Sequence, residues 1–135
     1  MVKLYSASQV RAIDHAEIAS GIPGIVLMER AGKAVFDRVF ALWPECDELI
    51  VLCGSGNNAG DGYVVAALAQ QCKLPVTVFH VKSPSELKGD AFKAAQSAKA
   101  IDVDMRSVEE LGRNTSGRFP IIIDALLGTG FTGEL

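Results

Sequence analysis

The sequence contains few cysteine, tryptophan and histidine residues and no long apolar run. Its 135 residues include only 3 cysteines, 1 tryptophan and 2 histidines. The cysteines are scattered and form no CxxC pair, which favours structural thiols over a metal or redox site. No apolar run reaches the roughly 18 residues of a membrane-spanning helix, and the first residues lack a signal-peptide core. The sequence therefore predicts a cytoplasmic protein.

Aromatic residues are few, and the net charge is small. The net charge is −3, aromatic residues make up 7% of the chain, and no block of basic residues occurs. Proteins bind nucleic acids and anionic membrane surfaces through clusters of basic residues, and the bases of single-stranded RNA stack on aromatic side chains. The composition thus argues against nucleic acid or a membrane as the main partner. The length fits one domain over residues 1–135.

Apolar runs of strand length alternate along the chain with stripes at helical spacing. Strands are expected at 48–53, 75–81 and 119–124, with a short one at 101–103. Helices are expected from about Ser6 or Ser8 and then at 23–42, 63–72 and 90–100, and a capping box at 107–110 opens a further short helix. This alternation predicts an α/β fold, a three-layer αβα Rossmann-like sandwich with a mostly parallel sheet. Because the chain stops just after a strand and a glycine turn, we expect the C-terminal part of this domain to be missing.

The stretch "GSGNNAGDG" (54–62) lies between a predicted buried strand and a predicted helix. Glycines there would allow positive φ and close approach of a ligand, and the helix N-terminus would favour an anion such as phosphate. The spacing of Gly54, Gly56 and Ala59 is a variant of the dinucleotide fingerprint, which is weak evidence alone. The next strand ends near His80 rather than at the acidic residue that contacts the NAD ribose. A tight turn without a ligand is the alternative.

A second polar cluster follows the Ile-rich strand at 119–124. Asp124 ends that strand, and a glycine-rich segment follows it. Because parallel strands end at one edge of a sheet, Asp124 is expected at the same edge as the 54–62 stretch. A carboxylate, an amide oxygen and carbonyls suit a hard cation such as K⁺ or Mg²⁺, and these residues do not decide between the two. The alternative is that Asp124 only caps the following turn.

Three motifs together carry a family resemblance. The segments "GIPGIVLMERAG" (21–32), "GSGNNAGDGYVVA" (54–66) and "DALLGTGFTGE" (124–134) resemble NAD(P)H-hydrate epimerase, the N-terminal half of bifunctional NAD(P)H-hydrate repair enzymes of bacteria. The resemblance covers nearly the whole chain. It implies interconversion of the R and S forms of hydrated NADH or NADPH, whose reduced nicotinamide ring carries a hydroxyl at C6.

The resemblance also implies the site residues. The substrate-binding residues would be Asn57, Asn58, Ala59, Gly60, Asp61, Gly128, Thr129, Gly130, Phe131, Thr132, Gly133 and Glu134. Asn58 and Asp124 would be ligands of K⁺. We assign no catalytic residue, because the family's later Asp-x-Pro-Ser-Gly segment, which supplies a further carboxylate, does not occur in this sequence. The chain alone is therefore expected to be incomplete for catalysis.

Partners follow partly from the resemblance and partly from the residues. The family works with a dehydratase, fused or separate, that uses ATP or ADP. The apolar stripe of the helix at 23–42 predicts a homodimer. Two other functions stay open: a non-catalytic scaffold module of the same fold, associated with nucleotides or RNA, and a general phosphate-binding flavodoxin-like domain. The intact 57–61 run favours substrate binding, and the missing basic stripe counts against an RNA scaffold.

Overall fold

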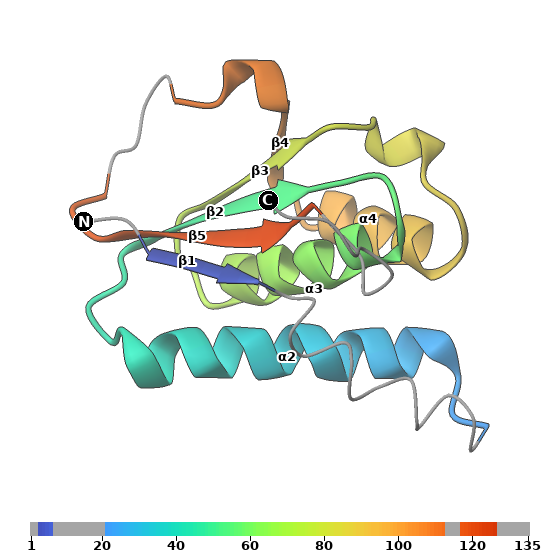
Figure 1. Ribbon diagram of the computed structural model, residues 1–135, viewed down its shortest axis with the longest axis horizontal. Coiled ribbons are helices and arrows are strands. Elements are labelled where there is room, and N and C mark those ends of the chain that lie inside the picture. The colour runs from blue at the N-terminus through green and yellow to red at the C-terminus, as the bar shows by residue number, and fades with distance from the viewer. Residues whose placement is uncertain (1–2, 7–20, 113–116, 127–135) are drawn as a thin grey trace.

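The computed structural model describes residues 3–6, 21–112 and 117–126, and its elements are labelled in Figure 1. The strands and helices are, in chain order, β1 (Lys3–Ser6), α2 (Gly24–Leu42), β2 (Glu48–Cys53), α3 (Asn57–Gln71), β3 (Val76–His80), α4 (Gly89–Ala100), β4 (Asp104–Ser107) and β5 (Pro120–Ala125). Two 3₁₀ turns, η1 (Pro84–Glu86) and η2 (Val108–Glu110), complete the set. Among these residues, no helix combines the length and the apolar character needed to cross a membrane.

The five strands form one sheet in the order β1-β5-β2-β3-β4. Every neighbouring pair is parallel, so the predicted α/β class with a parallel sheet is confirmed. Helix α3 packs on β2, β3 and β5, and α2 and α4 pack beside it (Figure 1). The described helices thus form one layer, and the described residues do not test the second helical layer of the predicted sandwich.

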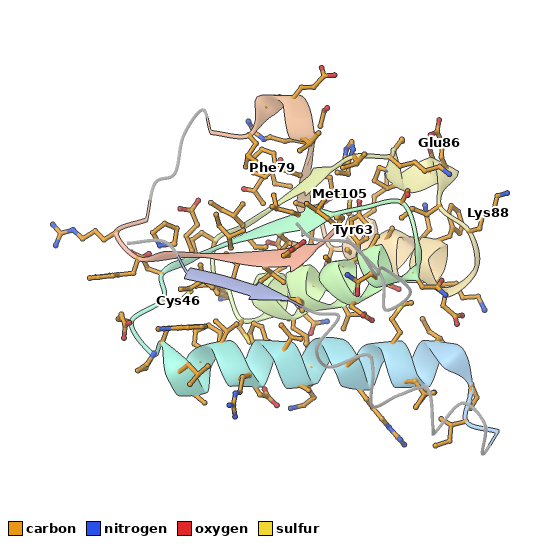
Figure 2. The ribbon with its side chains drawn as sticks, viewed as in Figure 1. Cys46, Tyr63, Phe79, Glu86, Lys88 and Met105 are labelled. Atoms are coloured by element: carbon orange, nitrogen blue, oxygen red, sulfur yellow. The ribbon has the colours of Figure 1, made fainter. Side chains whose placement is uncertain are left out.

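The core forms where α3 meets the middle of the sheet. Side chains alternate along a strand, so one set from each central strand faces α3. This set is fully buried and comprises Leu49, Val51 and Cys53 of β2 with Ile121, Ile123 and Ala125 of β5. Tyr63 of α3 is buried in the same core (Figure 2), and its hydroxyl has no hydrogen-bond partner within the part of the chain that the structure describes.

Two expectations about secondary structure are wrong. The first 43 residues were expected to be helical, with Ser6 or Ser8 as the N-cap, but Lys3–Ser6 is a strand paired with β5. A strand was also expected at 101–103, but β4 begins at Asp104. The preceding residues close the turn after α4, where Asp102 takes a positive φ of 63° that no strand allows. The rest of the first predicted helix, which was expected from about Ser6 or Ser8, lies outside the described residues.

Carboxylates at the start of β2 anchor the segment that enters β5. The Asp47 carboxylate accepts hydrogen bonds from the backbone N–H groups of Arg118 and Phe119, at 2.8 and 2.9 Å. Glu48 Oε1 accepts a third bond, from Gly117 N, at 3.0 Å. These backbone donors lower the pKa of Asp47, because they stabilise its charged form.

This anchor predicts a pH-dependent stability. A depressed carboxylate pKa stabilises the fold at pH values above the ordinary value of 3.8, and the contribution is lost as the pH falls below it. Urea unfolding of the wild type should therefore show a loss of stability below that pH, and Asp47→Asn should reduce the loss. Asp102→Asn removes another exposed carboxylate and should keep the wild-type pH profile. Identical profiles for Asp47→Asn and the wild type would contradict the assignment.

Candidate functional site at the ends of β2 and β5

The sheet order reverses between β2 and β5, and the candidate site lies at their carboxyl ends. From β2 the chain moves outward to β3 and β4, then returns to the other side of β2 as β5. In open parallel sheets the connections at such a point diverge and leave a crevice for a ligand. Asp124 lies there, paired in register with Leu52 of β2 and Ser6 of β1. The expected meeting of the two polar segments at one sheet edge is thus confirmed for Asp124 and the turn after β2.

Gly54 brings these two segments into direct contact. Its N–H donates to the Ala125 carbonyl oxygen at 3.0 Å. A Cβ atom on Gly54 would lie 2.3 Å from the carbonyl oxygen of Leu126. The positive-φ glycines of the described chain are Gly21, Gly89 and Gly112, so the expected positive φ in the 54–62 stretch is wrong. Glycine serves there for close approach of backbone instead.

Helix α3 begins at Asn57, six residues earlier than predicted. Gly56 precedes it as the N-cap and supplies no side-chain cap, while its carbonyl accepts from Ala59 N at 3.0 Å. Asn57 is exposed, whereas Asn58 is only 2% exposed and its Oδ1 atom is buried. The first turn of α3 therefore presents a helix N-terminus, which attracts anions, at the edge that also carries Asp124.

Ala59 and Gly60 lie inside the packing of the helices. A Cβ on Gly60 would lie 2.3 Å from Met28 Sδ of α2 and 3.0 Å from Ala91 Cα of α4. Gly32 of α2 is similarly close to Val64 of α3. The 21–32 and 54–66 motifs are thus two sides of one helix contact that holds the start of α3 in place. Ala59 and Gly60 therefore take part in the packing that positions the first turn of α3.

Asp61 and Cys53 are buried beneath the start of α3. Asp61 is 0% exposed, and Cys53 Sγ donates to the Ala59 carbonyl oxygen at 3.6 Å. Burial raises the pKa of the Cys53 thiol, and the nearby Asp61 charge raises it further. The Cys53 thiol is therefore a protonated, structural group rather than a nucleophile. Sequence reasoning did not place Cys53 at the site, although its position as the last strand residue before Gly54 was a usable signal.

Asp124 combines a turn-capping role with a position in the crevice. It is 6% exposed, and its Oδ1 accepts from Leu126 N at 3.0 Å. Ala125 contacts the α3 side of the sheet near Gly62, so the adjacent Asp124 is directed to the opposite face. The hydrogen bond to Leu126 N shows that Asp124 caps the following turn, as the alternative interpretation expected. The other carboxylate oxygen is a further potential acceptor. The predicted substrate residues at 128–134 lie outside the described residues.

The chemistry of the described site residues fits a hard cation. Within the described ranges there is no group of three or more histidine, cysteine, aspartate or glutamate residues that could hold a metal. A transition-metal centre built from these residues is therefore not supported. Asn58 and Asp124 instead offer an amide oxygen and a carboxylate, both buried, and oxygen donors of this kind suit a hard cation such as K⁺ or Mg²⁺.

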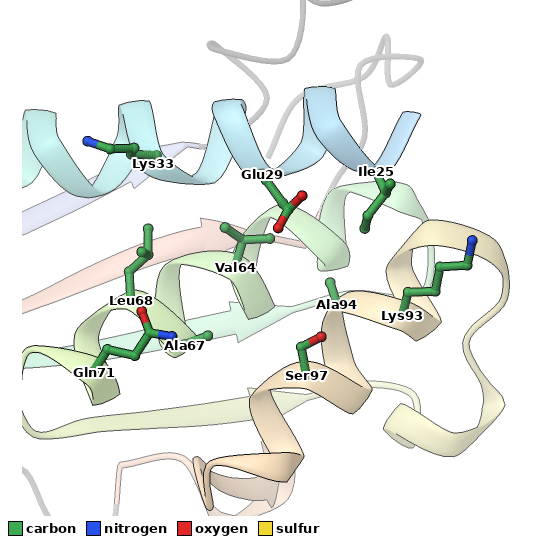
Figure 3. A pocket seen from close by; sticks show the side chains of 10 residues that line it. All are labelled: Ile25, Glu29, Lys33, Val64, Ala67, Leu68, Gln71, Lys93, Ala94 and Ser97. Carbon is green, nitrogen blue, oxygen red and sulfur yellow. The ribbon is translucent and has the colours of Figure 1, made fainter. Parts of the chain in front are cut away.

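A second hollow lies on the helical layer, away from the strand ends. It has a volume of about 330 Å³ and runs between α2 and α4 over α3. Val64 and Leu68 form part of its apolar floor, and Ser97 lines it from α4. Figure 3 shows the Glu29 carboxylate pointing into it from α2. None of the predicted site residues in the described part of the chain lines this groove.

Comparisons with known proteins agree on one family. A family model described as YjeF-related protein N-terminus matches residues 24–135. The bifunctional NAD(P)H-hydrate repair enzyme Nnr of Coxiella burnetii is 40% identical over 135 residues, which is 100% of this chain and 27% of that protein. The NAD(P)H-hydrate epimerase of Rhodopirellula baltica is 36% identical over 129 residues, 93% of this chain and 52% of that protein.

A further relative and a solved structure extend the match. The NAD(P)H-hydrate epimerase of Roseobacter litoralis is 32% identical over 153 residues, covering 100% of this chain and 67% of that protein. The crystal structure of yeast ynu0 superposes with a TM-score of 0.72 at 25% identity, covering 98% of this chain and 60% of that one. The chain thus spans from about a quarter to two thirds of the length of these proteins.

Proposed function

Because this chain belongs to the family of YjeF-related protein N-termini, we propose that it is an isomerase that epimerises hydrated NADH and NADPH at C6 of the nicotinamide ring. Relatives of this chain are named for NAD(P)H-hydrate epimerisation or repair. The observation that carries the proposal is the contact of two polar segments at the point where the sheet order reverses, with the Gly54–Ala125 hydrogen bond holding them together.

The proposed reaction needs little from the protein beyond positioning and proton transfer. The ring nitrogen donates its lone pair as the C6 hydroxyl leaves, protonated, as water, which forms a planar iminium. Water then adds to either face of C6 and loses a proton, so atoms and charge balance. The first turn of α3 binds an anionic part of the coenzyme through its N-terminal backbone, and Asn57 lies exposed at its tip. Asp61 holds the turn from beneath rather than touching the ring.

We also propose that K⁺ binds between Asn58 and Asp124. Both side chains are buried at the edge where β2 and β5 end, and a cation there would offset the buried charge of Asp124. The ion would supply no proton and no electron. Its contribution would be to fix the positions of the two segments that the coenzyme contacts.

An epimerisation assay tests this function. The purified R form of hydrated NADPH is incubated with the natural full-length gene product that contains this chain, because the chain alone is expected to be incomplete for catalysis. The S form is followed by chromatography in KCl and in LiCl. We expect conversion above the spontaneous rate, with K⁺ superior to Li⁺. Binding of hydrated NADPH without any conversion would favour the scaffold alternative instead. The S form made by the epimerase would be the substrate of a dehydratase. A dehydratase coupled to the assay therefore gives a second readout.

We further propose that two copies of the chain pair through the groove on the helical layer. Its apolar floor between α2 and α4 supports a homodimer, because such surface is costly to leave in water. Sedimentation should show a dimer that Leu68→Asp converts to a monomer. Leu111→Asp, an equal change at an exposed leucine outside the groove, should leave the dimer intact. A monomeric wild type would refute the pairing.

A further inference from the structure

A donor-rich pocket beside the end of β3 is not used by the proposed reaction. It has a volume of about 320 Å³ and lies between η1, α4 and the edge strand β4. Its polar lining consists of His80, Ser83, Ser85, Gln96 and Lys99. The side chains of Val103 and Met105 complete the wall.

The pocket lies one strand away from the candidate site. His80 ends β3 and is paired in register with Cys53, the last residue of β2. The Val81 N–H donates to the Cys53 carbonyl oxygen at 3.0 Å, which ties the two strand ends together. His80 lies two residues after the fully buried Val78, so it faces the helical layer with α4. A coenzyme bound at the start of α3 can therefore extend over β2 to this pocket.

The chemistry of the pocket favours a phosphate group. Lys99 provides an ammonium group, Gln96 an amide N–H₂, and His80 a ring nitrogen that can donate. The hydroxyls of Ser83 and Ser85 lie 3.1 Å apart, so both can converge on one ligand. Of the described residues that line the pocket, none carries a carboxylate. Several hydrogen-bond donors together with a cation in one pocket suit the oxygens of a phosphate group.

The place of the pocket in the sheet identifies which phosphate. In doubly wound dinucleotide-binding sheets, the strand next to the glycine-turn strand ends at the adenosine ribose. A carboxylate there accepts from the 2′-hydroxyl of NAD, whereas a cationic group accommodates the 2′-phosphate of NADP. Strand β3 occupies this position, and it ends not in a carboxylate but in His80, which lines the same pocket as Lys99.

We propose that this pocket binds the 2′-phosphate of the coenzyme and makes hydrated NADPH the preferred substrate over hydrated NADH. The inference rests on the proposed function, since it takes the coenzyme to lie across the ends of β2 and β3. His80 and Lys99 are the specificity-determining residues, and they contact the 2′-phosphate, which NAD lacks, rather than the adenosine or the reacting ring.

Calorimetric binding of NADP⁺, NAD⁺ and adenosine 2′,5′-bisphosphate to the full chain tests the pocket. We expect NADP⁺ to bind about tenfold more tightly than NAD⁺, as for one charge-assisted phosphate contact. Lys99→Met and His80→Asn should each reduce that ratio and weaken the bisphosphate, while leaving NAD⁺ binding unchanged. Lys93→Met removes an equal charge from another exposed lysine of α4 and should keep the wild-type ratio. Equal affinities for NADP⁺ and NAD⁺, or a ratio that Lys99→Met and His80→Asn do not change, would overturn the proposal.

Epimerisation of the two hydrates separates this inference from the proposed function. Equal kcat/KM values for hydrated NADPH and hydrated NADH would refute the pocket assignment and leave the epimerase intact. Absence of conversion of either hydrate, with the NADP⁺ preference and its loss in Lys99→Met retained, would refute the epimerase and support the 2′-phosphate pocket.

Discussion

Replacing Gly54 with alanine is expected to lower the free energy of unfolding by about 3 kcal/mol, at the upper end of the usual cost of overpacking. The added Cβ would lie 2.3 Å from the carbonyl oxygen of Leu126 and 2.9 Å from its carbonyl carbon. Backbone cannot rotate away as a long side chain can, so the ends of β2 and β5 must separate. The Gly54–Ala125 hydrogen bond, 3.0 Å long, would be strained or broken by that separation.

Gly56 provides a matched control two residues away. Its position has no atom within 4 Å of an added Cβ, and its φ of −108° is ordinary for alanine. Gly56→Ala should therefore change the free energy of unfolding by less than about 1 kcal/mol, the size of the backbone-entropy effect. Urea unfolding of the three proteins measures the difference. Similar stabilities for the Gly54 and Gly56 variants would show that the contact with Leu126 is not a tight one.

The same comparison reports on the site. Separation of the two strand ends moves Asp124 relative to the first turn of α3, so the Gly54 variant should also lose epimerase activity in conditions where it is still folded. The Gly56 variant should retain most of it. A Gly54 variant that is unstable but fully active when folded would mean that the contact between the two segments serves the fold alone.

Much of this fold follows from local patterns in the sequence. The apolar run before Gly54 predicts β2 with the observed bounds, Glu48–Cys53, because it ends at a turn signal and is too short for a helix. The helical stripe predicts α2 to within one residue, and Pro120 begins β5, where no ladder donor is required. In each case the local signal and the tertiary environment favour the same structure.

The errors arise where tertiary contacts decide the conformation. Lys3–Ser6 has four residues and little pattern of its own, and its strand exists because it pairs with β5 at the far end of the chain. The first turns of α3 contain glycine and asparagine, which are poor helix formers, so the prediction began the helix at Tyr63. Contacts with Met28 and Ala91 at Gly60 hold those turns helical instead.

The location of the site could be predicted from the sequence, but the arrangement of its side chains could not. The ends of parallel strands meet at one edge, so the neighbourhood of Asp124 and the glycine stretch followed from the strand predictions. The sequence did not reveal that Asn58 is buried while Asn57 is exposed, because this depends on the angle at which α3 leaves β2. The same holds for the burial of Asp61 beneath the turn.

Asp124→Asn is expected to reduce kcat/KM for epimerisation by about 10²-fold or more, as for loss of one preorganised electrostatic group. The substitution keeps an oxygen that can accept the hydrogen bond from Leu126 N, so the turn after β5 should stay in place. It removes the negative charge that the proposed K⁺ site requires. The half-saturating K⁺ concentration for activity should therefore rise together with the loss of kcat/KM.

Stability separates this role from a purely structural one. Asp124 is only 6% exposed, and burial of a charge without a cation destabilises a fold. In the absence of K⁺, Asp124→Asn should therefore match or exceed the wild type in urea unfolding, while K⁺ should stabilise the wild type and not the variant. Asp104→Asn, an exposed carboxylate that pairs with Arg106, should leave activity and its K⁺ dependence unchanged. A variant at Asp124 that is as active as the wild type, or one that loses stability in proportion to activity, would assign this carboxylate to the turn and remove the cation from the mechanism.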